Sequence, residues 1–266
     1  MLVTLLLAAC AGPASESIAY QDLPVGGSRI PDKPIPAKLA LPHGPGPFPA
    51  VILLHGCSGV SPNQEVWADR LRRWGYAVLV PDSFAPRGVS AVCAPQTQRL
   101  ATPRDRVADV ISAALYLRTR PEIDGERIGV LGQSHGGGTA ARATESQYEL
   151  EYPGLLRAAV DYYGSCGQPE MHGTVPLLVL AGDLDDWGSP ALSCQLLASH
   201  AKPDQPVEVH VYPGVYHAFD NASQPGRRLT FGHVLQYDYA ASADSYGRVQ
   251  AFLQKWMSPE IHDGGR

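Results

Sequence analysis

The chain alternates between short, mostly apolar runs and longer segments in which apolar residues recur at helical spacing. The apolar runs cover residues 50–56, 76–82, 127–132, 156–164, 176–182 and 207–212. Runs of this length are typical of strands buried on both faces, as in a parallel sheet. Helical segments lie between them, at residues 62–74, 103–117, 138–145, 190–201 and 245–257. Strands alternating with helices predict an α/β fold, a mostly parallel sheet of about eight strands flanked by helices.

The length of 266 residues suits one domain of this class. We expect it to span residues 29–258, with an antiparallel strand and loop at 35–49 leading in and a tail at 259–266. Charged residues make up 18% of the chain and the formal net charge is -5. Nucleic-acid binding needs a basic face, so the negative net charge argues against a nucleic-acid partner.

The first residues differ in character from the rest. Residues 2–7 are all apolar apart from one threonine, a run too short to cross a membrane but suited to the core of a signal peptide at 1–9. Residues 7–10, Leu-Ala-Ala-Cys, resemble a bacterial lipobox, although no Lys or Arg lies near the start. The resemblance implies cleavage before Cys10, lipid on Cys10 and an exported, periplasmic or membrane-anchored lipoprotein. A plain secretory signal and a buried strand are the alternatives, and residues 10–28 would be a tether or a first edge strand.

Export changes the interpretation of the other four cysteines, because an oxidising compartment favours disulfides. The predicted topology brings Cys57 and Cys93 to one rim and Cys166 and Cys194 to another, so we expect these two pairs. Four free buried thiols are the alternative. No pair has the CxxC spacing of a zinc site, and no metal is expected.

The segment GQSHGG at residues 132–137 carries the strongest chemical signal. It follows a predicted strand and precedes a predicted helix, which is the context of a nucleophile elbow, G-x-S-x-G. Gly132 and Gly136 lie two positions on either side of Ser134, where the tight turn brings helix and strand backbones together. A flexible glycine turn would need no such placement, and we therefore predict Ser134 as a nucleophile.

A serine hydroxyl needs a base, and the base needs an orienting acid. In an α/β-hydrolase the acid and then the histidine follow the serine along the chain. His217 lies on the loop after the run at 207–212 and is the expected base. Three other histidines compete less well because of their position or order: His55, His135 and His233.

The acid lies on the loop after the run at 176–182, which reads DLDDW. Asp185 is favoured over Asp183 and Asp186, and Asp161 at the end of the preceding strand is a weaker rival. The tetrahedral intermediate also needs two hydrogen-bond donors. We expect the backbone N–H of His135, next to the nucleophile, and that of Cys57 in the loop HGCSG.

Together these motifs resemble the dienelactone hydrolase family of α/β-hydrolases, from about residue 38 to residue 256. The resemblance is carried by HGCSG (55–59), PDSFAPRG (81–88), GQSHGG (132–137), AGDLDDW (181–187) and YHAFD (216–220). It singles out Asp185 as the acid and His217 as the base. The namesake enzymes have cysteine at the elbow where this chain has Ser134. That departure favours the family's broader esterases over dienelactone itself.

The resemblance also places Arg87 where the namesakes have an arginine facing the site. It implies that Arg87 binds a substrate carboxylate, with a structural salt bridge as the alternative. Residues 83–102 and 218–240 are the candidate lid segments. The second contains four aromatic residues that would line an acyl pocket or pack the last helix on the sheet: Phe219, Phe231, Tyr237 and Tyr239.

These observations predict a serine hydrolase of carboxylic esters or lactones that acts through an acyl-enzyme. They imply a small-molecule substrate, no cofactor, and a membrane contact only through lipid on Cys10. A peptidase related to prolyl oligopeptidases shares the elbow and the triad order, but the chain has no room for the propeller that those enzymes carry. A binding lipoprotein that keeps the fold without catalysis is the alternative from another class.

Overall fold

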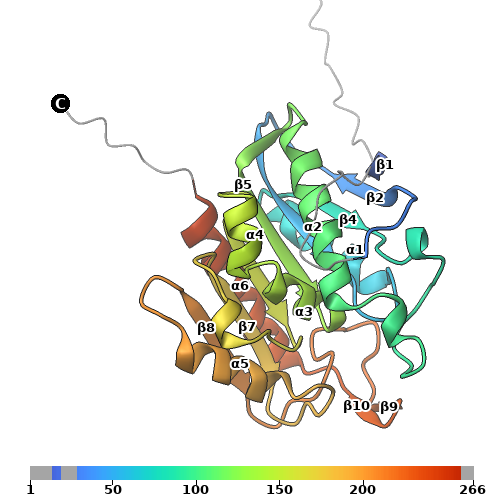
Figure 1. Ribbon diagram of the computed structural model, residues 1–266. Coiled ribbons are helices and arrows are strands. Elements are labelled where there is room, and N and C mark those ends of the chain that lie inside the picture. The colour runs from blue at the N-terminus through green and yellow to red at the C-terminus, as the bar shows by residue number, and fades with distance from the viewer. Residues whose placement is uncertain (1–13, 19–28, 259–266) are drawn as a thin grey trace, which may run out of the picture.

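We describe a computed structural model of the chain over residues 14–18 and 29–258. The predicted signal peptide, Cys10 and the tail at 259–266 lie outside the described residues. Eight strands form one sheet in the order β1-β2-β4-β3-β5-β6-β7-β8, and Figure 1 shows how the helices surround it. This arrangement confirms the predicted α/β-hydrolase fold. No described helix has both the length and the apolar character needed to cross a bilayer.

The sheet is antiparallel at one edge and parallel through its centre. β1 (Ala14–Ile18) pairs antiparallel with β2 (Ile35–Ala40), and β2 pairs antiparallel with β4 (Ala77–Pro81). The remaining neighbours are parallel: β3 (Phe48–Leu54), β5 (Ile123–Gln133), β6 (Ala158–Tyr162), β7 (Leu177–Gly182) and β8 (Val207–Tyr212). β1 shows that the segment 10–28 contributes an edge strand.

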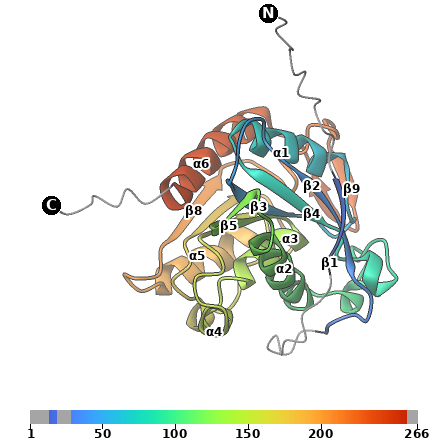
Figure 2. The ribbon, with the colours of Figure 1, turned by 90° about the horizontal axis from the view of Figure 1, so that it is seen from above.

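Helices cover both faces of the sheet, which is why its central strands are mostly apolar (Figure 2). On one face lie α1 (Pro62–Arg73) and α6 (Tyr239–Met257), whose Trp67 and Phe252 join a buried cluster with Leu53. On the other face lie α2 (Pro103–Arg118), α3 (His135–Arg142) and α5 (Pro190–His200), with the short α4 (Ser146–Glu151) beyond them.

Local signals fix several helix ends. α2 begins at the expected place because Thr102 and Asp105 form a reciprocal capping box around Pro103. α6 begins at Tyr239, six residues before the predicted start, because the Asp238 carboxylate accepts a hydrogen bond from the Ala241 N–H. The sequence pattern did not predict α4 or the hairpin of β9 (Arg228–Thr230) and β10 (His233–Leu235).

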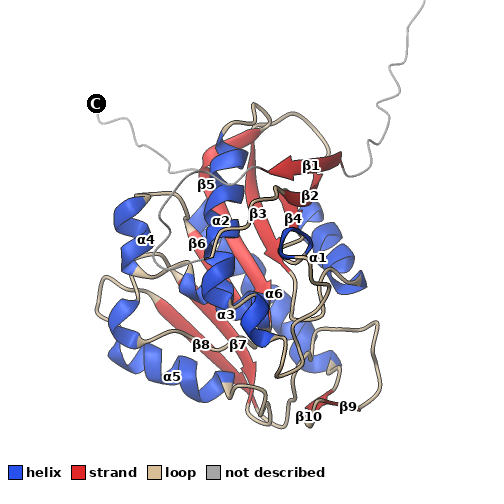
Figure 3. Cartoon of the chain, turned by 45° about the vertical axis from the view of Figure 1, so that its right-hand side comes forward, coloured by secondary structure: helices blue, strands red, loops and turns tan. Residues whose placement is uncertain are grey.

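The parallel strands all point the same way, so their carboxyl ends lie at one end of the sheet. The β9–β10 hairpin lies near that end (Figure 3). Ser134 follows β5 directly, Asp185 follows β7, and His217 follows β8. Loops after neighbouring parallel strands meet at their carboxyl ends. The fold therefore collects the predicted catalytic side chains at one end.

The close packing at the elbow predicts how a glycine substitution there changes the free energy of unfolding. A Cβ on Gly132 would overlap the carbonyl of Gly136, so Gly132→Ala is expected to lower the free energy of unfolding by at least about 2 kcal/mol. Gly247 lies exposed within α6, and a Cβ added there would have nothing within 4 Å, so Gly247→Ala should raise that free energy by about 0.5–1 kcal/mol. Urea unfolding of both variants measures the contrast, and equal effects would contradict the close approach at the elbow.

Candidate active site

Ser134 occupies a strained turn between β5 and α3. Its φ of 54° and ψ of -115° lie outside the regions that residues with a side chain usually adopt. The Ser134 N–H donates to the Tyr162 carbonyl at 2.8 Å, which ties the turn to β6. A Cβ on Gly136 would lie 2.5 Å from the Leu54 carbonyl oxygen, so only glycine fits at this position in the first turn of α3. The turn presents the Ser134 hydroxyl at the end of the sheet.

Three predicted residues come together at this turn. His217 Nε2 lies 2.9 Å from Ser134 Oγ, and His217 Nδ1 lies 2.7 Å from Asp185 Oδ2. An ionised carboxylate can only accept, so Nδ1 carries the proton and Nε2 is left to accept from the serine hydroxyl. Asp185 Oδ1 accepts a further hydrogen bond from the Trp187 N–H at 2.9 Å. Both Asp185 and His217 are buried, so the pair is shielded from water.

Two aromatic rings hold the imidazole of His217. Tyr163 meets it edge-on with ring centroids 4.8 Å apart, and Trp187 lies tilted against it at 5.1 Å. The Tyr163 hydroxyl donates to buried Asp220 at 2.5 Å, and burial raises the pKa of Tyr163, so that hydroxyl keeps its proton. The same Asp220 accepts from Gln133, the residue before Ser134, at 3.0 Å. Asp220 therefore connects the elbow to the ring that supports His217.

The rival acids and bases have other partners. Asp183 accepts from the Gly214 N–H, and Asp186 lies 3.0 Å from Nδ1 of His233. Asp161 is fully buried beneath the site; burial raises its pKa to about 7, against the hydrogen bond from the Gly164 N–H. None of these three carboxylates is hydrogen-bonded to His217.

His55 and His135 are also engaged elsewhere. His55 accepts from the Ser83 N–H, and its other ring nitrogen lies 2.8 Å from the Gly56 carbonyl. His135 lies between Arg106 and the Ala101 carbonyl, each 2.9 Å from one ring nitrogen. Burial, with the nearby charge of Arg106, lowers the pKa of His135 to about 3 and that of His55 well below its usual value. Both rings are neutral at ordinary pH.

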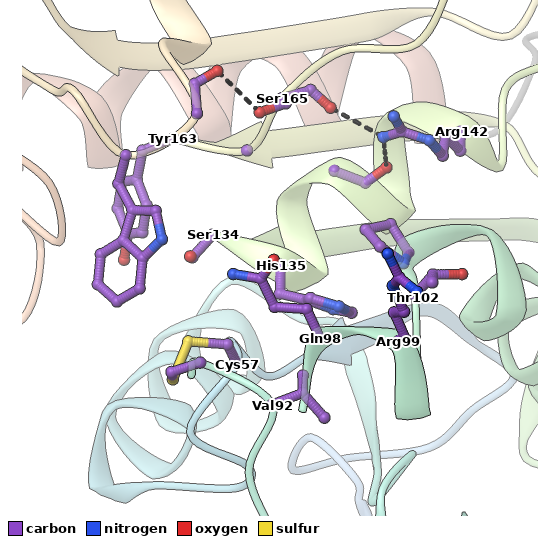
Figure 4. A pocket seen from close by; sticks show the side chains of 16 residues that line it. Cys57, Val92, Gln98, Arg99, Thr102, Ser134, His135, Arg142, Tyr163 and Ser165 are labelled. Atoms are coloured by element: carbon purple, nitrogen blue, oxygen red, sulfur yellow. Dashed lines mark hydrogen bonds between the residues drawn. A yellow bond between two sulfur atoms is a disulfide. The ribbon is translucent and has the colours of Figure 1, made fainter. Parts of the chain in front are cut away.

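The space around Ser134 has two lobes. The larger, of about 440 Å³, runs from Tyr163 past Ser134 and His135 to Arg142 and Arg99 (Figure 4). The smaller, of about 120 Å³, is bounded by His217 and by the loops after β3 and β8. Four residues line both lobes: Cys57, Ser134, Tyr163 and Trp187. Ser134 therefore lies where the two lobes meet.

The larger lobe has a basic character. Its charged lining residues are Arg99 and Arg142, and no carboxylate is among the residues that line it. Arg142 donates through Nη1 to the Gly138 and Ser165 carbonyls, both at 3.0 Å. Burial lowers the pKa of Arg142, but a guanidinium stays protonated at neutral pH.

Cys57 and His135, whose backbone N–H groups are the two predicted donors, both line the larger lobe beside Ser134. Within the described residues neither N–H donates a hydrogen bond to the protein. A Cβ on Gly56 would lie 3.7 Å from the Ser134 Cβ, which shows how closely the turn after β3 approaches the elbow.

Arg87 is held differently from what its motif implied. Its guanidinium makes two hydrogen bonds to Asp109, at 2.9 and 3.0 Å, and the two side chains are 6% and 0% exposed. It also donates to the Ser83 carbonyl, and it lines neither lobe beside Ser134. This geometry is the structural salt bridge that the sequence left as the alternative.

Both predicted disulfides are present, Cys57–Cys93 and Cys166–Cys194. Disulfides of this kind are typical of exported proteins. Asp161, Cys166 and Cys194 are the one group of potential metal ligands gathered within 4.8 Å among the described residues. Two of the three are joined in a disulfide and offer no thiolate, so the group does not fit a metal ion.

Sequence reasoning missed the walls of the site. No role was predicted for Tyr163, Trp187, Arg142 or Asp220, although Trp187 and Asp220 end the motifs AGDLDDW and YHAFD. The four come together only in the folded chain. The positive φ of Tyr163, 44°, has no sequence signal either. Of the four aromatic candidates, Phe219 is buried in the core, whereas Tyr239 is largely exposed and Phe231 lies over Trp187.

The sequence model of the dienelactone hydrolase family matches residues 35–257. The chain belongs to this family. It is 26% identical over 226 residues to the "Probable 2-oxo-3-(5-oxofuran-2-ylidene)propanoate lactonase" of Bradyrhizobium sp., a match that covers 77% of this chain and 86% of the relative.

Solved structures share the fold at lower identity. A dienelactone hydrolase from Anabaena variabilis superposes with a TM-score of 0.61 at 16% identity, covering 92% of this chain and 98% of that one. A dienelactone hydrolase-like promiscuous phosphotriesterase from metagenomic libraries gives 0.69 at 18%, covering 92% and 99%. A thermophilic carboxylesterase, also from a metagenomic library, gives 0.63 at 16%, covering 94% and 90%. As a family member with these neighbours, the protein is a hydrolase.

The buried Arg87–Asp109 pair leads to a test of its structural role. Arg87→Met removes the cation that faces the buried Asp109 carboxylate and should lower the free energy of unfolding by about 3–5 kcal/mol. Arg73→Met is the matched control, because the Arg73–Asp69 pair is exposed and should cost less than about 1 kcal/mol. Denaturant unfolding compares the two. A stable Arg87→Met protein that loses only turnover of acidic esters would instead place Arg87 in substrate binding.

Proposed function

We propose that the protein hydrolyses carboxylic esters or lactones through an acyl-enzyme formed on Ser134. The observation that carries the proposal is the hydrogen-bonded chain of Ser134, His217 and Asp185 on loops after three parallel strands. His217 Nε2 takes the Ser134 proton as Oγ attacks the substrate carbonyl carbon. Asp185 keeps the imidazole in the required tautomer and stabilises the imidazolium.

The tetrahedral intermediate carries its negative charge on the former carbonyl oxygen. Cys57 and His135 line the pocket beside Ser134, and their N–H groups are the proposed donors to that oxygen. When the intermediate collapses, His217 gives its proton to the leaving alcohol oxygen. Water then attacks the acyl-enzyme, with His217 again as base, and releases the acid and free Ser134.

The two lobes suggest how the substrate lies. His217 lines only the smaller lobe, and it must reach the leaving oxygen to protonate it. The alcohol portion therefore belongs in the smaller lobe and the acyl portion in the larger one. The larger lobe ends at Arg99 and Arg142, which favours an acyl group with a carboxylate at its far end. In a lactone the two portions are tethered and would bridge both lobes.

The disulfides and the lipobox resemblance together support an exported protein anchored through lipid on Cys10. The mature chain would then act in the periplasm or at the membrane surface. Mass spectrometry of the N-terminal peptide from the native host tests this part separately from the chemistry. An unprocessed N-terminus without lipid would contradict it.

Hydrolysis of p-nitrophenyl esters from acetate to octanoate tests the chemistry, with wild type beside Ser134→Ala. We expect turnover by wild type and a loss of about 10⁴-fold or more in kcat for the variant, because the nucleophile is removed. Matched neutral and carboxylate-bearing acyl groups in the panel test the basic end of the larger lobe. A folded Ser134→Ala protein with wild-type turnover would exclude the mechanism. An inactive but folded wild type would favour a peptidase or a binding lipoprotein.

A further inference from the structure

We propose that the Cys57–Cys93 disulfide is a positioning element of the oxyanion hole, holding the Cys57 N–H where it meets the substrate oxygen. The inference rests on the proposed function, since it assigns this bond a part in the same reaction. A donor that stabilises a transition state must be held to within about 0.5 Å by its surroundings. Cys57 lies beyond the last residue of β3, on a turn without strand pairing.

The first part of this turn is held from beneath by α2. Arg106 donates to the His55 carbonyl at 2.9 Å, and the His55 ring contacts both Gly56 and Ser83. His55 is fully buried. These contacts fix the chain up to Gly56, one residue before the proposed donor.

From Cys57 onward the turn is held by a different segment, residues 90–93. The Cys57 side chain is bonded to Cys93, and the Cys57 carbonyl accepts from the Val92 N–H at 2.8 Å. Ser58 Oγ lies 3.4 Å from Cys93 Sγ, and Gly59 packs so close to Ser90 that a Cβ would lie 2.7 Å from its carbonyl oxygen. Ser58 itself is exposed and lines the smaller lobe.

The segment 90–93 belongs to the loop of residues 82–102, which has only a small core of its own. Phe84, Val92 and Ala101 form that cluster, with Cys57 and Val89 packed against it. The same loop supplies Gln98 and Arg99 to the wall of the larger lobe. A covalent bond across 36 residues therefore couples the proposed donor to the loop that forms part of the acyl pocket.

Opening the bond should act on the transition state more than on the bound substrate. The Cys57 N–H is needed most when charge develops on the oxygen, and complete loss of such a donor costs about 100–1,000-fold in rate. A donor that is loosened rather than removed should cost less. We therefore expect kcat to fall by about 10- to 100-fold while KM changes by less than about threefold.

Cys93→Ser opens the bond without altering Cys57 or its backbone. Cys194→Ser is the matched control, because it opens the other disulfide, whose cysteines line neither lobe beside Ser134. Both variants are assayed well below their unfolding temperatures. The expected result is a large fall in kcat for Cys93→Ser only. Equal kcat values for the two variants, or a wild-type kcat for Cys93→Ser, would overturn the inference.

Binding of a trifluoromethyl ketone distinguishes a positioning role of the Cys57–Cys93 disulfide from a purely structural one. The ketone forms a tetrahedral adduct with Ser134 whose oxygen anion occupies the hole. Its affinity should weaken in Cys93→Ser by about the same factor as kcat, whereas affinity for a neutral product alcohol should not. Equal weakening of both ligands would indicate general loosening and contradict the positioning role.

If Cys93→Ser does not fold, the bond is opened instead by chemical reduction of the wild-type protein. Dithiothreitol supplies two electrons and two protons, the S–S bond becomes two thiols, and the reagent closes to its cyclic disulfide. Alkylation and mass spectrometry follow which pair is opened. Activity should fall with the appearance of Cys57 and Cys93 thiols; full activity after they appear would overturn the inference. Untreated wild type without esterase turnover would instead count against the proposed function.

Discussion

The sharp turn at Ser134 is the constraint on which the proposed site depends. It exists because α3 approaches β5 at Gly132 and the end of β3 at Gly136 so closely that neither glycine admits a side chain, while Ser134 itself takes a φ of 54°. Strain of this kind persists only where surrounding structure enforces it. Here the β6 backbone holds the Ser134 N–H, and buried Asp220 holds Gln133 just before the turn. The serine hydroxyl can then point only toward the ends of the parallel strands.

The rest of the site follows from the strand order. β7 and β8 lie beyond β6, so their loops bring Asp185 and His217 to the same end of the sheet as the elbow. β3 lies on the other side of β5, and its loop brings Cys57 to the opposite flank of Ser134. Base and proposed oxyanion donor therefore lie on different sides of the nucleophile. Cys57 lines both lobes whereas His217 lines only the smaller one, which favours one orientation of an ester across Ser134.

The sequence was sufficient for features that depend on neighbours along the chain. Apolar runs located the central strands, and the Thr102–Pro103 signal located the start of α2, because each depends on local burial or capping. Features that depend on residues far apart in the sequence could not be predicted from it. Ile123 lengthens β5 because it pairs with Phe48, and Arg87 turns away from the pocket because Asp109 on α2 is buried beside it. Tyr163 and Trp187 reach His217 only through the folded loops.

Labelling of the intact protein with a fluorophosphonate tests the central claim most directly, because only an activated serine displaces the fluoride. The account predicts one adduct per chain, located at Ser134 by peptide mass spectrometry, and none in His217→Ala. Folded wild-type protein that stays unlabelled, or that carries the adduct on another residue, would contradict the claim that Ser134 is the nucleophile.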